Sequence, residues 1–85
     1  MTFDPADHLR GGLRSANWRS SDLWVASFAI GGNLNADEID HITSGRRAPS
    51  RLEYNVLAAA LNDHLADVGG GPSVPYWRDL PPNGL

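Results

Sequence analysis

The sequence has no cysteine, no lysine and no long apolar run. Without cysteine the chain can form neither a disulfide framework nor a thiolate metal site, which suits a reducing compartment. The longest apolar-rich stretch, residues 23–30, is too short to cross a bilayer, and the N-terminus lacks the apolar core of a signal peptide. We therefore expect a cytoplasmic protein with no membrane segment.

Motifs of catalysis and of cofactor binding are also missing. The glycine run at 69–71 is not followed by the Lys-Ser/Thr pair of a phosphate-binding loop, and no G-x-S-x-G or HExxH pattern occurs. Asp40 and His41 are sequence neighbours, so on a helix their side chains diverge by about 100° and cannot form a catalytic relay. Asp37 and His41 lie one helical turn apart, but two ligands do not make a metal site. The sequence predicts no enzyme, no cofactor and no metal.

The charge balance restricts the partners. All 7 basic residues are arginine, against 10 acidic residues, and the net charge is −3. Most nucleic-acid binders carry a basic patch, so a DNA-binding surface here would need a cluster of these few arginines. The lack of lysine, together with many alanines and glycines, suits a GC-rich genome such as that of an actinobacterium or its phage.

The 85 residues are enough for one small domain, and the pattern of its first part predicts two helices. Asp4 can cap a helix that starts at Pro5, but the glycines at 11–12 weaken it, so we expect a short or broken helix over about 5–16. A second helix is expected over about 23–30, because the cap-forming residues 20–22 precede it and Gly31-Gly32 ends it. A short buried strand is the alternative there. Its aromatic neighbours are expected in the core: Trp18, Trp24 and Phe28.

Two capping boxes mark the helices that follow. Asn35 and Glu38 have the spacing of one box, and Gly45 is a natural stop, so a short helix is expected over about 36–44. Ser50 and Glu53 form the second box, before a helix over about 51–68. The expected apolar stripe of that helix is Leu52, Val56, Leu57, Ala60, Leu61, His64 and Leu65.

The tail from 69 to 85 is rich in Gly and Pro and cannot form an ordinary helix or a central strand. It nonetheless carries heavy apolar residues. We expect Pro75-Tyr76-Trp77 to fold back on the core or to serve as a contact surface. A short helical turn over about 76–80 is possible within it.

Residues 25–65 place particular residue types in a recurring order. A small residue in one helix is followed by a turn residue, two apolar residues of the next helix, a glycine and basic residues, and these are Ala29, Asn33, Ile39, Ile42, Gly45, Arg46 and Arg47. This order resembles the lambda-repressor-like, or Cro/CI-type (XRE), helix-turn-helix family. Asn33 tolerates the left-handed conformation that such a turn requires.

The resemblance implies an all-α, four- to five-helix domain over 1–68 with a Pro-rich tail over 69–85. Its helix-turn-helix motif would span about 23–45, and the helix at 51–68 would support it. In that family the second motif helix enters the DNA major groove. The residues implied to face the bases are Asn35, Ala36, Asp37, Asp40 and His41. The residues implied to hold phosphates are Arg46, Arg47 and Arg51. The implied function is a small transcriptional regulator that binds double-stranded DNA as a homodimer.

Acidic residues on the second motif helix leave an alternative open. Asp37, Glu38 and Asp40 would be repelled by phosphates, although they also favour the helix N-terminus and keep the surface solvated. The alternative is a degenerate helix-turn-helix, phage- or antitoxin-like, whose acidic helix and Tyr76-Trp77 tail bind a protein with a basic surface. In the same way, Arg47 or Arg51 could pair with a neighbouring carboxylate instead of a phosphate.

Overall fold

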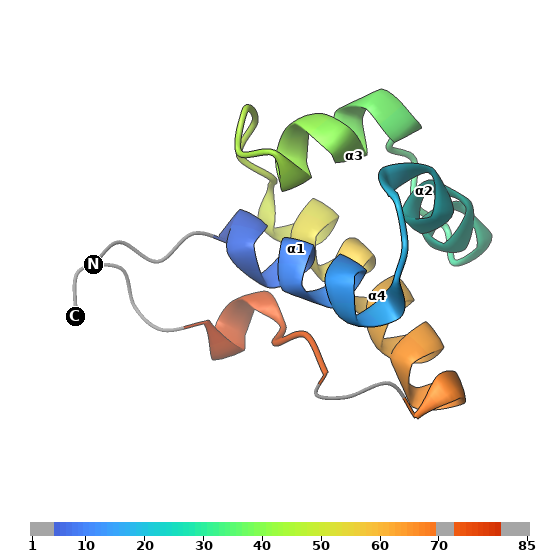
Figure 1. Ribbon diagram of the computed structural model, residues 1–85. Helices are drawn as coiled ribbons and strands as arrows, with labels where there is room; N and C mark the ends of the chain where they lie inside the picture. Colours follow the sequence, from blue (N-terminus) through green and yellow to red (C-terminus); the bar gives the residue numbers. More distant parts are fainter. Residues whose placement is uncertain (1–4, 70–72, 81–85) are drawn as a thin grey trace.

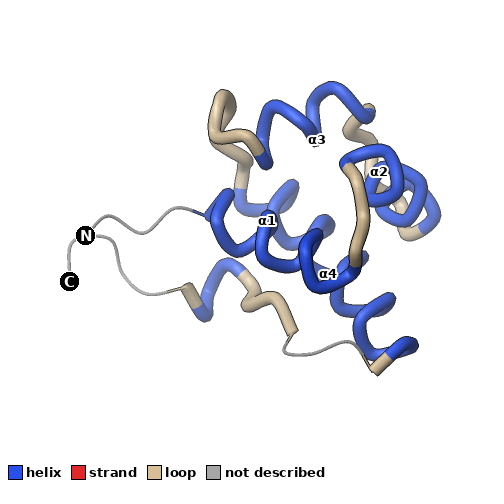
Figure 2. The backbone as a smooth tube through the Cα atoms, in the orientation of Figure 1, coloured by secondary structure: helices blue, strands red, loops and turns tan. Residues whose placement is uncertain are grey.

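The chain forms four α-helices and one 3-10 turn in a computed structural model that describes residues 5–69 and 73–80 (Figure 1). The elements are α1 (Pro5–Ala16), α2 (Ser20–Ala29), α3 (Ala36–Thr43), α4 (Arg51–Val68) and η1 (Trp77–Asp79). The described residues contain no strand (Figure 2), so the prediction of an all-α domain is confirmed. None of their helices has the length and apolar character needed to cross a membrane.

The first helix, α1, is continuous where the sequence suggested a break. Leu9 and Leu13 are four residues apart, so they lie on one face of the helix, and both are buried. Packing of this face outweighs the cost of the two glycines. Asn17 ends the helix with φ 57, and the amide of Trp18 donates to the carbonyl of Leu13 at 2.9 Å, which closes the last turn.

The second helix, α2, begins at Ser20, three residues before the expected start. The amide of Arg19 donates to the Asp22 carboxylate at 2.9 Å, so Asp22 serves as the acidic half of a cap, and the helix starts ahead of it. Trp18 is partly buried against the core, where it stacks on His64. The prediction that Trp24 and Phe28 lie in the core is wrong, because both are exposed.

The connection between α2 and α3 differs from the expected tight turn. Residues 30–35 separate the helices, and Gly31, with φ 94, takes the left-handed conformation. Asn33 does not, since Asn17 is the one described residue other than glycine with a positive φ. Ala29, expected as the small residue packed inside the motif, is exposed, and Ser27 is buried in its place. The resemblance is therefore wrong in two roles, that of Asn33 as the left-handed turn residue and that of Ala29 as the buried small residue.

Both predicted capping boxes are present. The Asn35 side chain accepts from the amide of Glu38 at 2.8 Å, and the Glu38 carboxylate accepts from the amide of Asn35 at 3.0 Å. Ser50 and Glu53 make the same pair of bonds at the start of α4. Gly45, with φ 83, ends α3 one residue earlier than expected.

The longest helix, α4, is the centre of the fold, because α1, α2 and η1 all pack against it. Its buried face consists of Tyr54, Leu57, Ala58, Ala60, Leu61 and Leu65. The expected stripe is thus partly wrong. Tyr54 and Ala58 had been left out of it, whereas Leu52, which had been included, is 74% exposed.

Residues 73–80, the described part of the tail, fold back on α4. This was one of the two expectations for the tail. Asn62 bonds to both backbone groups of Val74, accepting from its amide at 2.6 Å and donating to its carbonyl at 2.9 Å. The Tyr54 hydroxyl donates to the carbonyl of Pro75 at 2.8 Å, and the Trp77 ring meets Tyr54 edge-on. Asp4 and the rest of the tail, 70–72 and 81–85, lie outside the described residues.

Candidate nucleic-acid interface

The third helix, α3, lies on the surface of the domain with one face buried and one open. Ile39 and Ile42 fill the inner face and have no exposed area. The outer face carries Asp37, Asp40 and His41, all exposed. Their spacing of three and four residues places these side chains on one side of the helix.

Two of the predicted base-contacting residues are less available than the sequence suggested. The side-chain oxygen of Asn35 is used by the cap of α3, which was the alternative to pairing with adenine. Ala36 is half-buried. Of the five residues predicted to face the bases, Asp37, Asp40 and His41 keep exposed side chains that the cap of α3 does not use.

The N-terminus of α2 lies next to the N-terminal half of α3. The Ser20 hydroxyl bonds to the Asp40 carboxylate at 3.2 Å, and Arg19 and Ser20 border the same shallow hollow as Ala36 and Asp37. In Figure 1, α2 is seen partly end-on while α3 runs across the top of the view. The shared hollow places the exposed Arg19 beside α3.

Arg47 is held by two carboxylates. Its guanidinium lies 3.1 Å from the Glu38 carboxylate and 2.9 Å from the Glu53 carboxylate, so it joins the capping box of α3 to that of α4. The amide of Ser50, which donates to Glu53, lowers the pKa of Glu53, and the charge of Arg47 lowers it further against the opposing effect of burial. Of the two interpretations of Arg47, the structure shows the ion pair.

Arg46 and Arg51 differ from Arg47, although they are near it in sequence. Both are exposed, and neither makes an ion pair with any described residue. Arg10 is used within the fold, where it pairs with Asp7 and donates to the carbonyl of Thr43 at 2.6 Å. Arg14 is also exposed, in the last turn of α1. The exposed arginines next to α3 are Arg19, beside its N-terminal half, and Arg46 and Arg51, which follow its C-terminus in the chain.

Sequence reasoning missed two features of this region. Arg19 was not among the predicted site residues, because only the packing of α2 against α3 brings it there. The exposed apolar face of α2 was missed because the segment is apolar on every side, a pattern that does not say which side is buried. No group of His, Asp and Glu side chains among the described residues has the arrangement of a metal site.

No protein-family model matches the chain, and comparison with curated proteins and with solved structures gave no match. The likeness to Cro/CI-type proteins stays a prediction from the sequence.

Proposed function

We propose that the chain is a helix-turn-helix DNA-binding module in which α3 lies in the major groove. The observation that carries the proposal is the placement of exposed arginines at both ends of an exposed helix: Arg19 beside the start of α3, and Arg46 and Arg51 after its end. Phosphates flank the major groove on both sides, so cations at both ends of an inserted helix can contact them. One small module makes few contacts, so we expect it to bind a two-fold site as a dimer.

The chemistry of α3 restricts what it can recognise. The carboxylates of Asp37 and Asp40 accept hydrogen bonds and do not donate, and the base group that suits them in the major groove is the amino group of cytosine. His41 can donate to guanine or to phosphate. The carboxylates also repel phosphates, so binding should be weak at physiological salt and depend on the three exposed arginines.

The proposal is tested by substitution of the exposed Arg46 and Arg51, with Arg47 as the control. Fluorescence anisotropy would follow binding to sheared genomic DNA and to a pool of random duplexes as salt is raised. The Arg46→Ala/Arg51→Ala double variant should bind more weakly, and the slope of log K against log salt should fall by about two. Arg47→Ala should leave the slope unchanged and cost at most about 1 kcal/mol of stability, because its partners are carboxylates at the surface.

Absence of any binding by the wild type at low salt would overturn the proposal. An equal loss of slope in Arg47→Ala would also contradict it, because that result would place Arg47 on phosphate rather than between Glu38 and Glu53.

A second candidate function is supported by the charge of the outer face of α3. With Arg47 neutralised by its two ion pairs, the exposed charges on α3 itself are the carboxylates of Asp37 and Asp40. Such a face would attract a protein with a basic surface. The tail contributes less to this candidate than the sequence suggested, because Trp77 packs against Tyr54 and its amide bonds to Asn55.

Photo-crosslinking in cells separates the two candidates. A photoreactive amino acid in place of His41 would sit on the outer face of α3, next to whatever covers it. DNA adducts would support the first function. Protein adducts that disappear in an Asp37→Asn/Asp40→Asn variant would support the second.

A further inference from the structure

The outer face of α2 is apolar and uncovered. Leu23 and Ser27 point into the domain and are buried. On the opposite side, Val25 is 61% exposed and Phe28 is 67% exposed, and Trp24 lies next to them. The outer face consists of residues 21, 24, 25, 28 and 29, none of them charged. A helix that is apolar on both sides is normally covered on both sides.

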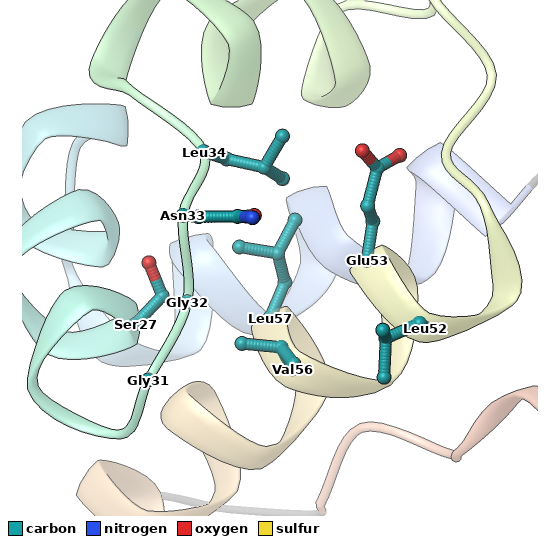
Figure 3. A pocket seen from close by; sticks show the side chains of 9 residues that line it. All are labelled: Ser27, Gly31, Gly32, Asn33, Leu34, Leu52, Glu53, Val56 and Leu57. Carbon is teal, nitrogen blue, oxygen red and sulfur yellow. The ribbon is translucent and has the colours of Figure 1, made fainter.

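A groove begins where α2 ends. It lies between the segment that follows α2 and the start of α4 (Figure 3), and it encloses about 110 Å³. Gly31 and Gly32 form one wall, and Leu52 and Val56 form the other. Gly32 is needed for this shape, since a Cβ there would lie 2.8 Å from the carbonyl oxygen of Ser27 and 3.1 Å from Val56.

Leu52 extends the apolar surface across the groove. It is 74% exposed and stands on the α4 side of the opening, opposite the end of α2. The groove also contains Glu53, but Arg47 pairs with that carboxylate. We define the outer face of α2 (Trp24, Val25 and Phe28), together with the groove and Leu52, as the α2 patch. Asp22 lies at its edge, in the first turn of α2, where its carboxylate accepts from the amide of Arg19.

We propose that the α2 patch binds a second copy of this chain in a two-fold symmetric dimer. In such an interface the same patch serves both protomers, so it must be complementary to itself. The patch combines an exposed phenyl ring, that of Phe28, with a nearby apolar groove. An apolar cavity of about 150 Å³ can hold a benzene ring, so the groove of one protomer can take much of the Phe28 ring of the other.

Charge and area both favour a second copy as the occupant. Two copies each carry a net charge of −3, and an uncharged contact lets them meet without placing like charges together. The patch exposes apolar surface on the order of 400 Å² per protomer, since one aromatic side chain can bury 150–250 Å². A standard interface buries about 800 Å² per partner, of which about 56–65% is apolar. The patch thus supplies the apolar share of one interface.

The patch shares no residue with the surface proposed for DNA, so the dimer and the contact of α3 with DNA can be tested separately. A protein that dimerises and binds no DNA would support the dimer and overturn the DNA function. A monomer that binds DNA would overturn the dimer, and with it the two-fold mode of DNA binding, but would leave the contact of α3 with DNA.

Sedimentation velocity of the full chain tests the dimer over a range from about 10 to about 300 µM, in which a dimer of micromolar affinity would be populated. The wild type should approach twice its 9.2 kDa mass at the upper end. Phe28→Glu should weaken association at least tenfold, because it places a charge in the partner's apolar groove. Val68→Glu is the matched control, since Val68 is 59% exposed but lies at the far end of α4.

Circular dichroism would verify that each variant is folded. Leu52→Glu provides a second variant on the other wall of the groove, and it should also weaken association at least tenfold. A wild type that stays monomeric over the whole range would overturn the proposal. So would a dimer that is disrupted by Val68→Glu and not by either patch variant.

Discussion

Gly12 allows α1 to approach the rest of the core closely. A Cβ at this position would lie 2.6 Å from a methyl group of Val74 and 2.9 Å from one of Leu61, whereas a Cβ on Gly11 would meet nothing within 4 Å. Each glycine costs helix stability of about 1 kcal/mol relative to alanine. The two neighbours therefore differ in one respect only, the space beside them.

Alanine substitutions at these two positions should have opposite effects on the free energy of unfolding. Gly11→Ala should stabilise the domain by roughly 0.5–1 kcal/mol. Gly12→Ala should destabilise it by roughly 1 kcal/mol, because an overpacking cost of 1–3 kcal/mol exceeds the gain in helix propensity. Urea unfolding followed by circular dichroism would measure both. Equal stabilisation by the two substitutions would mean that α1 does not pack this closely.

Residue roles that depend on near neighbours could be predicted from the sequence, whereas roles that depend on distant contacts could not. The capping boxes of Asn35 and Ser50 were predicted correctly, because each involves atoms three residues apart. The partners of Arg47 come from two different helices, and the sequence could only offer the ion pair as an alternative. The roles of Asn33 and Ala29 were taken from the residue spacing of a motif with a tight turn. Residues 30–35 make a longer connection between α2 and α3, so that spacing does not apply.

At the scale of the element, the sequence determined helix types better than helix faces. The bounds of α4 were predicted correctly because a capping box and a glycine delimit it. The buried side of α2 was not, since apolar residues surround that helix and the neighbouring helices decide which side is covered. The same cause misplaced Trp24 and Phe28. The same holds for the candidate site. Its helix, α3, was predicted, whereas the arginines that stay exposed around α3 depend on how the helices pack.

The contact between α4 and the tail should be sensitive to alkaline pH through Tyr54. Burial raises the pKa of Tyr54 from 10.0 to about 12. Its hydroxyl donates to the carbonyl of Pro75, and a phenolate could not. The raised pKa means that the neutral form is favoured in the folded state. This contribution to stability is complete below pH 10 and is lost as the pH rises from about 10 to about 12.

The pKa of Tyr54 can be measured in the Tyr76→Phe variant, because Tyr54 is then the sole tyrosine of the chain. Absorbance at the phenolate band should titrate near pH 12 in the folded variant and near pH 10 in denaturant. Further substitution of Tyr54→Phe should remove the alkaline loss of stability between these values. A folded-state midpoint near 10 would show that Tyr54 is not held against the tail.

At the scale of the whole molecule, the described structure has a well-packed interior and an unusually apolar exterior on one helix. The core residues of α1, α3 and α4 are buried in one continuous cluster. The domain is small, so this cluster provides only a modest stability margin. Covering the α2 patch would add apolar burial that a domain of this size lacks alone. Dimerisation and folding stability should therefore be linked.

This linkage predicts a melting temperature that depends on protein concentration. A partner that binds only the folded state stabilises it by mass action. For a domain of this size, a stabilisation of about 1 kcal/mol raises Tm by roughly 4–8 °C. A hundredfold increase in wild-type concentration should accordingly raise Tm on the order of 5 °C, measured by circular dichroism in cells of different path length. Val68→Glu should retain the dependence, and Phe28→Glu should have a single Tm at every concentration, since its patch no longer binds a second copy. A wild-type Tm that does not change with concentration would show that association does not stabilise the fold. That result would contradict the proposal that the α2 patch binds a second copy.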